Sequence, residues 1–420
     1  MKQVFPRHGF APEAVKSEVA GFLKQERSAR EDAFNVAWPN GPEGVTELAL
    51  DVQRSFRNLN GFFTSASPAL GHVDGELRSM IAEILNAPSG QCVTITVGGT
   101  ESNFLAVKTA RDKFRSERGL SRETRLNIVA PYTAHPSFDK HAQMMDLDVV
   151  RVAVGPDWQA DVRALDAAMT GNTFMLVGSV PSYTHGAIDP ISALGALALK
   201  RNVWLHVDAC VGGFLHPFLK KRNNLPDFDF SVPGVSSISA DLHKFGYCLN
   251  GISSFTLRDV ANLEHQAYDT DGIWPTGRYY RKTFVGSRSG SVVGAAWAVF
   301  KHLGESGFTA IAEKIARASE EMAEGLARID GLTLNVAPRC GVLSAAVDPS
   351  ISISTLVSEI QKRGFQVGRA ADPPSLHFLL DPVEDDRLVS DYVEAVSHAM
   401  QAVRRGLASE VADGGHVYGA

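Results

Sequence analysis

The stretch Ser239-Ala-Asp-Leu-His-Lys-Phe-Gly-Tyr247 organises the rest of the chain. It follows the apolar run Val232 to Ile238, which is typical of a buried strand, and it places a histidine beside Lys244. A lysine that forms a Schiff base must be neutral part of the time, and burial lowers its pKa because burial disfavours the ammonium. Most lysines lie at the surface, so an isolated His-Lys pair would not indicate a site. Here further motifs accompany the pair.

Two segments upstream of the lysine end in residues that bind cofactors in α/β proteins. Trp204-Leu-His-Val-Asp208 is an apolar strand that ends in an aspartate and is followed by a glycine turn. A carboxylate at the C-terminal tip of a strand lies where open α/β sheets place their ligands. Further back, a strand runs through Gly98-Gly99 into a helix, where glycines let backbone N–H groups approach a phosphate.

A phosphate cradle, a strand-end aspartate and a later lysine are, in this order, the parts that pyridoxal 5′-phosphate (PLP) requires. We expect Lys244 to form the Schiff base with the cofactor. Asp208 should keep the pyridine nitrogen protonated, so that the ring accepts the electrons left when a bond at the substrate's α-carbon breaks. Gly99 and Thr100 should donate hydrogen bonds to the phosphate. Taken singly, each motif also has an ordinary explanation: a surface lysine, a turn or N-cap aspartate, and a turn into a helix with Thr100 as its cap. It is their combination that predicts PLP.

The sequence resembles the fold-type I PLP enzymes of the decarboxylase branch and, within that branch, the sphingosine-1-phosphate lyases. The matching stretches are collinear, span most of residues 50–310, and read Gly98-Gly-Thr-Glu-Ser, Thr133-Ala-His-Pro-Ser-Phe-Asp-Lys140, His185-Gly-Ala-Ile-Asp-Pro190, His206-Val-Asp-Ala-Cys-Val-Gly-Gly-Phe214, Ser237-Ile-Ser-Ala-Asp-Leu-His-Lys-Phe-Gly-Tyr247 and Gly286-Ser-Arg288. Asn103 after the glycines and Asp229-Phe-Ser-Val-Pro-Gly234 look equally like archaeal-type tyrosine or aspartate decarboxylases. The resemblance implies an α/β protein of the aspartate aminotransferase-like fold. That fold has a large, mostly parallel sheet domain and a smaller α+β C-terminal domain.

The resemblance also implies roles for residues that the motifs alone do not assign. His243 matches the family histidine that contacts the cofactor phosphate. His135 matches the one that stacks on the pyridine ring and can assist proton transfer. Gly286 and Ser287 match a segment that reaches the phosphate from the neighbouring subunit, which implies a homodimer with a shared active site.

Further candidates lie on the substrate side. Three tyrosines and one arginine are candidates for holding the substrate, passing a proton or binding an anion: Tyr247, which we also count among the catalytic residues, Tyr183, Tyr279 and Arg288. Each tyrosine is equally well explained by ordinary packing with a satisfied hydroxyl. Where the family carries a lysine that helps to hold the substrate phosphate, this chain has Asn250, which supplies no positive charge. Whether the substrate is phosphorylated therefore stays open.

We expect a PLP-dependent carbon–carbon lyase that cleaves an amine or β-hydroxy amine by a retro-aldol step. The alternative is a PLP-dependent L-amino acid decarboxylase of the tyrosine or aspartate type, and an aminotransferase is less favoured because the motifs belong to the decarboxylase branch. A PLP-binding protein without catalysis, or a scaffold on the same fold, also stays open, because a fold does not secure a function.

Composition excludes several other classes of function. The net charge of −6 over 420 residues shows no basic bias towards nucleic acid or an anionic membrane. The N-terminus lacks the apolar core of a signal peptide, and no apolar run approaches the ~20 residues of a membrane span, so we expect a cytoplasmic protein. The four cysteines lie far apart without a CxxC pair, which predicts neither a disulfide framework nor a metal site.

The pattern along the chain divides it into four parts. We expect an N-terminal arm over 1–45, with one helix from Pro12 to about Arg30, that wraps the partner subunit. A large PLP-binding α/β domain over 46–305 follows, with strands at 92–97, 126–130, 148–152, 174–179, 203–207, 236–240 and 251–256. A long functional loop is expected over 268–288 and two helices at 290–302 and 307–328. A small α+β domain over 306–407 should have strands at 332–336, 342–347, 366–369 and 376–380, and a mobile tail over 408–420 should follow.

Overall fold

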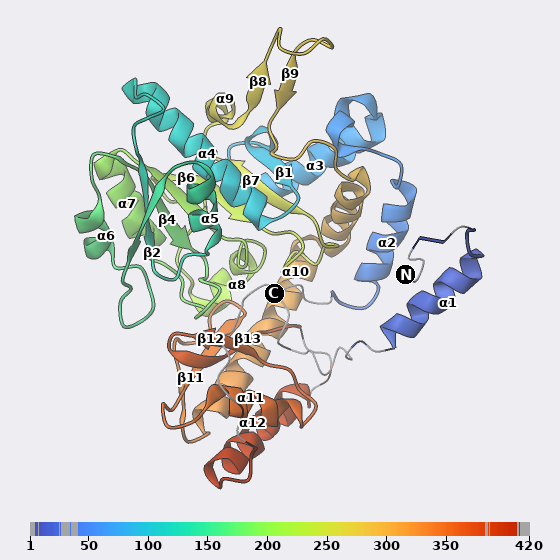
Figure 1. Cartoon of the computed structure of the whole chain (residues 1–420), viewed down its shortest axis with the longest axis vertical. Coiled ribbons are helices and arrows are strands. Elements are labelled where there is room, and N and C mark those ends of the chain that lie inside the picture. Colours follow the sequence, from blue (N-terminus) through green and yellow to red (C-terminus); the bar gives the residue numbers. More distant parts are fainter. Residues whose placement is uncertain are drawn as a thin grey trace.

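The computed structural model of the chain describes residues 5–6, 8–24, 26, 34, 41–382, 385, 387–409 and 411. The expected tail therefore lies almost entirely outside the described residues, as does much of the expected arm. Within the arm, helix α1 (Pro12–Leu23) is present, and none of its residues is buried (Figure 1). Within the described residues, no helix combines the length and the apolar character that a membrane crossing needs.

A seven-stranded sheet forms the centre of the molecule, with the strand order β1-β7-β6-β5-β4-β2-β3. The strands are β1 (Val93–Thr96), β2 (Asn127–Pro131), β3 (Asp148–Val152), β4 (Thr173–Ser179), β5 (Trp204–Asp208), β6 (Val235–Ala240) and β7 (Ser253–Leu257). Strand β7 pairs antiparallel with β1 and β6, and the other pairs are parallel. All seven expected strands are confirmed, with their ends shifted by no more than two residues. Their apolar runs are as expected for strands that are covered on both faces of the sheet.

Helices cover the two faces of this sheet. Successive residues of β4 show the division, because Leu176 belongs to one buried cluster and Val177 to the other. On the side of Val177 lie α4 (Gly99–Arg118) and α5 (Ser137–Met144). The other side carries α7 (Ile191–Arg201), and α6 (Val162–Ala168) packs near it (Figure 1). Helix α8 (His216–Asn223) was not expected from the sequence.

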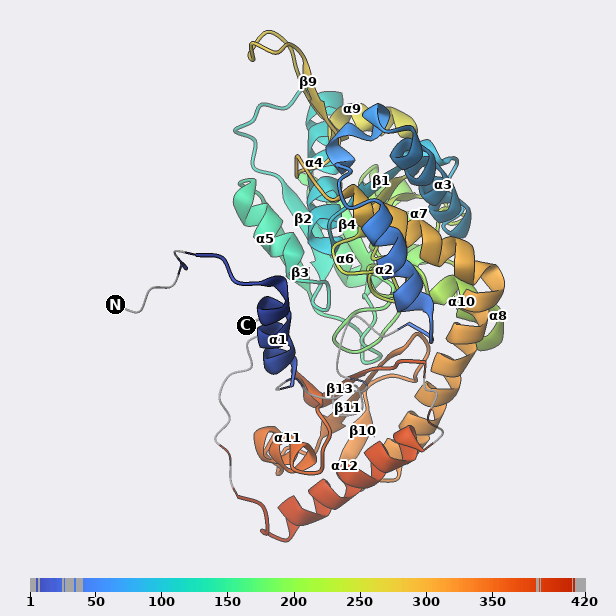
Figure 2. The ribbon, with the colours of Figure 1, turned by 90° about the vertical axis from the view of Figure 1, so that its right-hand side faces the viewer.

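Three further helices pack together beside the sheet. Helices α2 (Val45–Ser55) and α3 (Pro68–Ile84) pack against the first part of α10 (Gly290–Ala327). Helix α10 is interrupted at Gly304, whose φ is +56°, so the expected break between two helices is confirmed. From there α10 runs down to the C-terminal part of the molecule (Figure 2).

The C-terminal part is an α+β unit, as expected. Its antiparallel sheet has the order β10-β11-β13-β12. The elements are β10 (Leu332–Leu334), β11 (Val342–Val347), α11 (Ile353–Gln361), β12 (Gly368–Ala371), β13 (Pro374–Leu379) and α12 (Leu388–Arg404). The exact domain boundaries of the sequence analysis remain predictions.

The expected long loop over 268–288 contains a hairpin that the sequence analysis did not predict. After the short helix α9 (Leu263–Gln266), strands β8 (Tyr268–Thr270) and β9 (Tyr279–Arg281) pair antiparallel. The hairpin projects away from the body of the molecule, and its tip is apolar, with Ile273 70% and Trp274 54% exposed (Figure 2).

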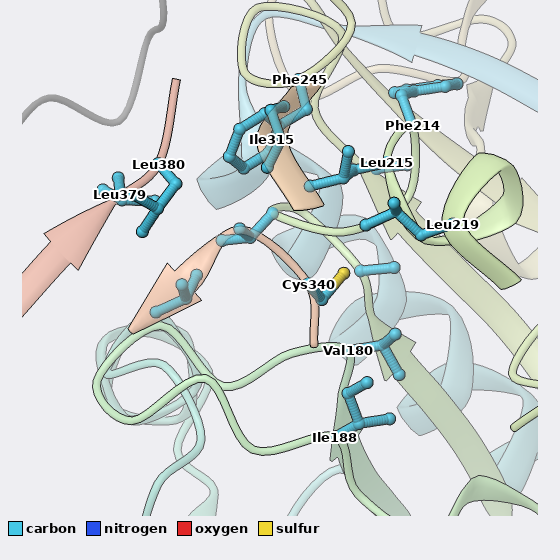
Figure 3. Packing of buried hydrophobic residues seen from close by; sticks show 14 of the residues in the cluster. Val180, Ile188, Phe214, Leu215, Leu219, Phe245, Ile315, Cys340, Leu379 and Leu380 are labelled. Atoms are coloured by element: carbon cyan, nitrogen blue, oxygen red, sulfur yellow. The ribbon is translucent and has the colours of Figure 1, made fainter. Parts of the chain in front are cut away.

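A buried cluster fixes the backbone next to Lys244. Phe245 packs with Leu215 and with Ile315 of α10. All three side chains lie close to Gly341, the residue before β11. Leu379 and Leu380 complete the cluster from the C-terminal part (Figure 3). The segment that carries the lysine is therefore held between the central sheet and the C-terminal sheet.

Candidate active site

A cavity of about 500 Å³ lies beside the C-terminal ends of β4, β5 and β6. Its lining includes seven of the residues expected at the site: Gly99, Thr100, His135, Tyr183, Asp208, His243 and Lys244. The carboxyl ends of parallel strands meet at one edge of a sheet, and this is where such folds place their ligands. The structure thus brings together the lysine, the strand-end aspartate and the glycine turn.

The amine of Lys244 is paired with a carboxylate that the sequence analysis did not single out. Its Nζ lies 3.0 Å from Oδ2 of Asp241, and its side chain is 20% exposed. Burial lowers the pKa of Lys244, but the charge of Asp241 and neighbouring anions more than offset burial, so the pKa lies above its ordinary value. The expectation that burial would lower this pKa is therefore corrected, because it left out the carboxylate three residues earlier.

Asp208 is held at the end of β5 by hydrogen bonds from three groups. Its Oδ2 accepts from Nδ2 of Asn103 on α4 at 3.1 Å, and its Oδ1 accepts from the N–H of Cys210 at 3.1 Å and from the hydroxyl of Ser239 at 3.4 Å. Burial raises the pKa of Asp208, but the nearby His135 and His206 and the Cys210 N–H offset that effect and leave it below its ordinary value. The carboxylate is therefore charged at neutral pH.

A chain of hydrogen bonds behind the cavity ends on Asp208. The indole N–H of Trp204 donates to the hydroxyl of Ser237 at 2.7 Å, and that hydroxyl pairs with Nδ1 of His206 at 2.8 Å. His206 Nε2 in turn lies 3.1 Å from Oδ1 of Asn103. Burial lowers the pKa of His206 to about 4, so the ring is neutral, and donation by Ser237 to Nδ1 leaves the proton on Nε2. Each hydrogen bond in this chain is then donated in the direction of the Asp208 carboxylate.

The two glycines at the start of α4 leave room for an anion. A Cβ at Gly99 would lie 2.6 Å from Sγ of Cys210 and 2.8 Å from Oδ1 of Asp241, so a side chain at this position would have to displace these two buried groups. A Cβ at Gly98 would meet no atom nearer than Cε1 of His243 at 3.8 Å. The N-terminus of this helix faces the cavity that Lys244 lines, and free N–H groups there favour a phosphate. The residues present therefore fit PLP.

Two histidines of the cavity are neutral at pH 7. Burial lowers the pKa of His135 and that of His243. The N–H of Ser137 donates to Nδ1 of His135 at 3.2 Å, and the N–H of Ile252 donates to Nδ1 of His243 at 3.3 Å. In each neutral ring the proton then lies on Nε2.

Several expected site residues do not line the cavity. Tyr247 follows Lys244 closely, but a φ of +54° turns its side chain into the core. Within the described residues its hydroxyl has no hydrogen-bond partner, and burial together with Asp381 raises its pKa far above the ordinary value. Asn250 is exposed. Tyr279 lies in the hairpin against the rings of Tyr268 and Trp274.

The segment Gly286-Ser287-Arg288 is bound to another loop rather than to the cavity. Nδ2 of Asn60 donates to the hydroxyl of Ser287 at 3.0 Å, and Oδ1 of Asn60 accepts from the N–H of Arg288 at 3.2 Å. Glu101 connects the residues just before this segment to the glycine turn, since its carboxylate accepts the N–H of Val97 at 2.7 Å and that of Phe284 at 2.9 Å.

The sequence analysis missed Asp241, Glu101 and Asn60 as contributors to the site. Asp241 and Glu101 lie inside the quoted motifs, so position within a motif was a signal that could have found them. Asn60 had no such signal.

Known proteins are similar to this chain over most of its length. Residues 29–344 match the family described as pyridoxal-dependent decarboxylase conserved domain. The chain is 32% identical to sphingosine-1-phosphate lyase of Arabidopsis thaliana, over 96% of this chain and 74% of that protein. It is 29% identical to a probable L-tyrosine/L-aspartate decarboxylase of Methanothermobacter thermautotrophicus, over 77% of this chain and 85% of that protein. The solved structure of a sphingosine-1-phosphate lyase from Burkholderia pseudomallei is 29% identical, with a TM-score of 0.89 over 97% of this chain and 94% of that one.

Proposed function

The chain belongs to the pyridoxal-dependent decarboxylase family and is a PLP-dependent lyase, and from that premise we propose that it cleaves the Cα–Cβ bond of an amine or β-hydroxy amine in a retro-aldol reaction at Lys244. One observation carries the proposal. Lys244, Asp208 and the glycine turn at Gly98 line a single cavity. These are the lysine, the counter-charge for the pyridine nitrogen and the phosphate cradle that such chemistry needs.

When bound, PLP supplies an electron sink for the bond that breaks at the α-carbon of the substrate. The residues of this chain supply charge and protons around it. Asp208 is ionised and held by three hydrogen bonds, so it can stabilise a positive charge on a ring nitrogen. His135 carries its proton on Nε2 at neutral pH and can donate from that atom. Gly98 and Gly99 leave backbone N–H groups free for a phosphate.

Retro-aldol cleavage is favoured over decarboxylation because the sphingosine-1-phosphate lyases match 96–97% of this chain at 29–32% identity, whereas the archaeal decarboxylase matches 77% of it. An L-amino acid decarboxylase is the second candidate, because the archaeal relative is described as a probable L-tyrosine/L-aspartate decarboxylase. A product screen separates the two. Incubation with β-hydroxy amines should yield an aldehyde, whereas release of carbon dioxide from tyrosine, aspartate or glutamate would instead establish the decarboxylase.

The role of Lys244 is tested by Lys244→Ala. Lysine-bound PLP absorbs near the visible edge, and borohydride fixes it to the lysine. We expect the wild type to show this absorbance and to carry the fixed label on Lys244, and Lys244→Ala to lose both together with product formation. Lys200→Ala, which removes an exposed lysine paired with Asp166, should behave as the wild type. A label on another lysine would refute the assignment.

We also propose a homodimer in which Gly286 and Ser287 complete the site of the partner subunit. Neither residue lines the cavity of its own chain; Asn60 bonds Ser287, and Glu101 holds Phe284 just before the segment. The neighbouring hairpin exposes Ile273 and Trp274 at its tip, an apolar surface that association would cover. Co-expression of Lys244→Ala with Gly286→Trp should restore activity that neither variant has alone. No restoration, despite dimers in sedimentation, would contradict a shared site.

A cytoplasmic location is the last part of the proposal. Its support is that Cys92, Cys210, Cys248 and Cys340 are all free and buried, as is common in reducing compartments. Fractionation of cells that express the tagged chain tests it, and recovery with the membrane fraction would refute it.

A further inference from the structure

A second cavity of about 420 Å³ adjoins the one that holds Lys244. The two cavities share three lining residues: Thr133, His135 and Tyr183. The far wall of the second cavity comes from strand β12, from Asp372 and from His377 of β13, so this cavity lies between the central sheet and the C-terminal sheet. A substrate held at Lys244 that is longer than the first cavity would extend past His135 and Tyr183 into this space.

One of the two arginines in this second cavity is fully engaged by the protein. Arg151 forms an ion pair with Asp139 and donates to the carbonyls of Pro131 at 3.1 Å, Ala134 at 2.6 Å and His135 at 3.3 Å. These bonds hold the loop that presents His135. Arg151 is therefore a positioning residue, with its donors turned towards backbone rather than towards the cavity.

Arg369 on β12 is engaged differently. Its position is fixed by strand pairing opposite Leu376 of β13, and its side chain is half-buried. Among the residues that the structure describes, the one hydrogen bond made by its guanidinium goes to the hydroxyl of Ser354 at 3.0 Å. A guanidinium has five N–H donors in a rigid fork that suits carboxylates and phosphates, so most of its donors remain available to the cavity.

The one carboxylate in the lining of this cavity, that of Asp372, forms no direct ion pair with Arg369 among the described residues. This carboxylate lies near Tyr132 instead, and it raises the pKa of the Tyr132 hydroxyl. Burial lowers the pKa of His185, which shares the lining, so that ring adds no charge at pH 7. Among the described residues, Arg369 thus carries a guanidinium beside the reaction cavity that no ion pair engages.

We propose that Arg369 binds an anionic group, a carboxylate or a phosphate ester, on the amine substrate of this lyase and thereby sets its substrate class. The proposal rests on the proposed function, because it takes the first cavity to be the place of reaction. The amine is held at Lys244 and the anion at Arg369, with His135 and Tyr183 between them.

The test compares two pairs of amines on the PLP-loaded enzyme, through the change in absorbance that each amine causes on binding. Aspartate against asparagine probes a carboxylate, and O-phosphoethanolamine against ethanolamine probes a phosphate ester. In at least one pair the wild type should bind the anionic member more tightly. Arg369→Gln should weaken the binding of that anionic amine roughly ten- to a hundredfold and leave the binding of its neutral partner unchanged. Arg369→Lys keeps the charge but not the fork, and should give an intermediate loss.

The matched control is Arg363→Gln, which removes an arginine paired with Glu359 at the end of α11 and outside both cavities. It should bind all four amines as the wild type does. Equal weakening of charged and neutral amines by Arg369→Gln would show a structural role and overturn the proposal, as would a wild type without preference in either pair. A wild type that never acquires the absorbance of lysine-bound PLP would instead overturn the proposed function.

Discussion

The Nζ of Lys244 lies 3.0 Å from Oδ2 of Asp241, three residues earlier in the chain. This ion pair decides the state of the lysine before cofactor binds. Burial alone would favour the neutral amine, but Asp241 reverses that effect and raises the pKa of Lys244 above its ordinary value. A lysine in this state must give up a proton and its carboxylate partner before it can act as a nucleophile.

Asp241→Asn should therefore lower the pKa of Lys244, because the amide has the same shape without the charge while burial persists. A paired charge at this distance commonly shifts a pKa by about one unit or more. The rate at which PLP attaches to the apoenzyme, followed by absorbance over a series of pH values, should show a midpoint displaced downward. Asp166→Asn, which breaks an exposed pair with Arg201, is the control. An unmoved midpoint would show that Asp241 does not set this pKa.

Asp208→Asn should separate cofactor binding from catalysis. The substitution keeps the size of the side chain but removes the negative charge at the end of β5. Loss of an electrostatic contact to the reacting system costs about a hundredfold or more in kcat. We expect PLP to remain bound, as judged by absorbance, and KM to change far less than kcat. Partial recovery in Asp208→Glu would support a role for the charge, whereas full activity in Asp208→Asn would exclude it.

Gly99→Ala should destabilise the apoenzyme, and Gly98→Ala should not. The added methyl group at position 99 would collide with Cys210 and Asp241, and overpacking of this kind costs about 1–3 kcal/mol. At position 98 the nearest atom would be 3.8 Å away, and the backbone there is extended. Urea denaturation of both apoenzymes gives the two free energies of unfolding. Equal values would mean that the contacts at Gly99 relax without cost.

The sequence predicts those features that depend on short stretches. Each strand of the central sheet is an apolar run between turns, and Asp208 and Gly98 follow directly at strand ends, so their place at one sheet edge follows from the topology. The break in α10 was also visible, because Gly304 and Gly307 interrupt the helical pattern.

What the sequence did not predict depends on contacts between distant segments or on backbone angles. Asn103 contacts Asp208 only because α4 crosses the sheet near β5, and Asn60 contacts Ser287 across most of the chain length. The strands of the hairpin are three residues long, too short for a periodic pattern. Tyr247 looked like a site residue from its place beside the lysine, but its positive φ turns the side chain away from the cavity.

Acid should destabilise the fold through His206. Its pKa is about 4 in the folded chain because burial disfavours the charged ring, against ~6.5 in an unfolded chain. Between these values the unfolded state binds more protons, so the free energy of unfolding falls as the pH falls, by about 1.4 kcal/mol per pH unit for one such group. Above pH 6.5 the contribution is constant, and below pH 4 it falls no further.

His206→Gln should therefore flatten the pH dependence of stability between pH 6.5 and 4 by about one proton, whatever it does to stability at pH 7. Urea denaturation at a series of pH values gives the slope. His141 and His216, whose pKa values burial also lowers to about 4, should account for a remaining slope in the variant. His8→Gln, at an exposed histidine, should leave the slope as in the wild type. An unchanged slope in His206→Gln would mean that this ring takes up its proton as readily in the folded as in the unfolded chain, and that the neutral Trp204–Ser237–His206–Asn103 chain behind Asp208 is not maintained.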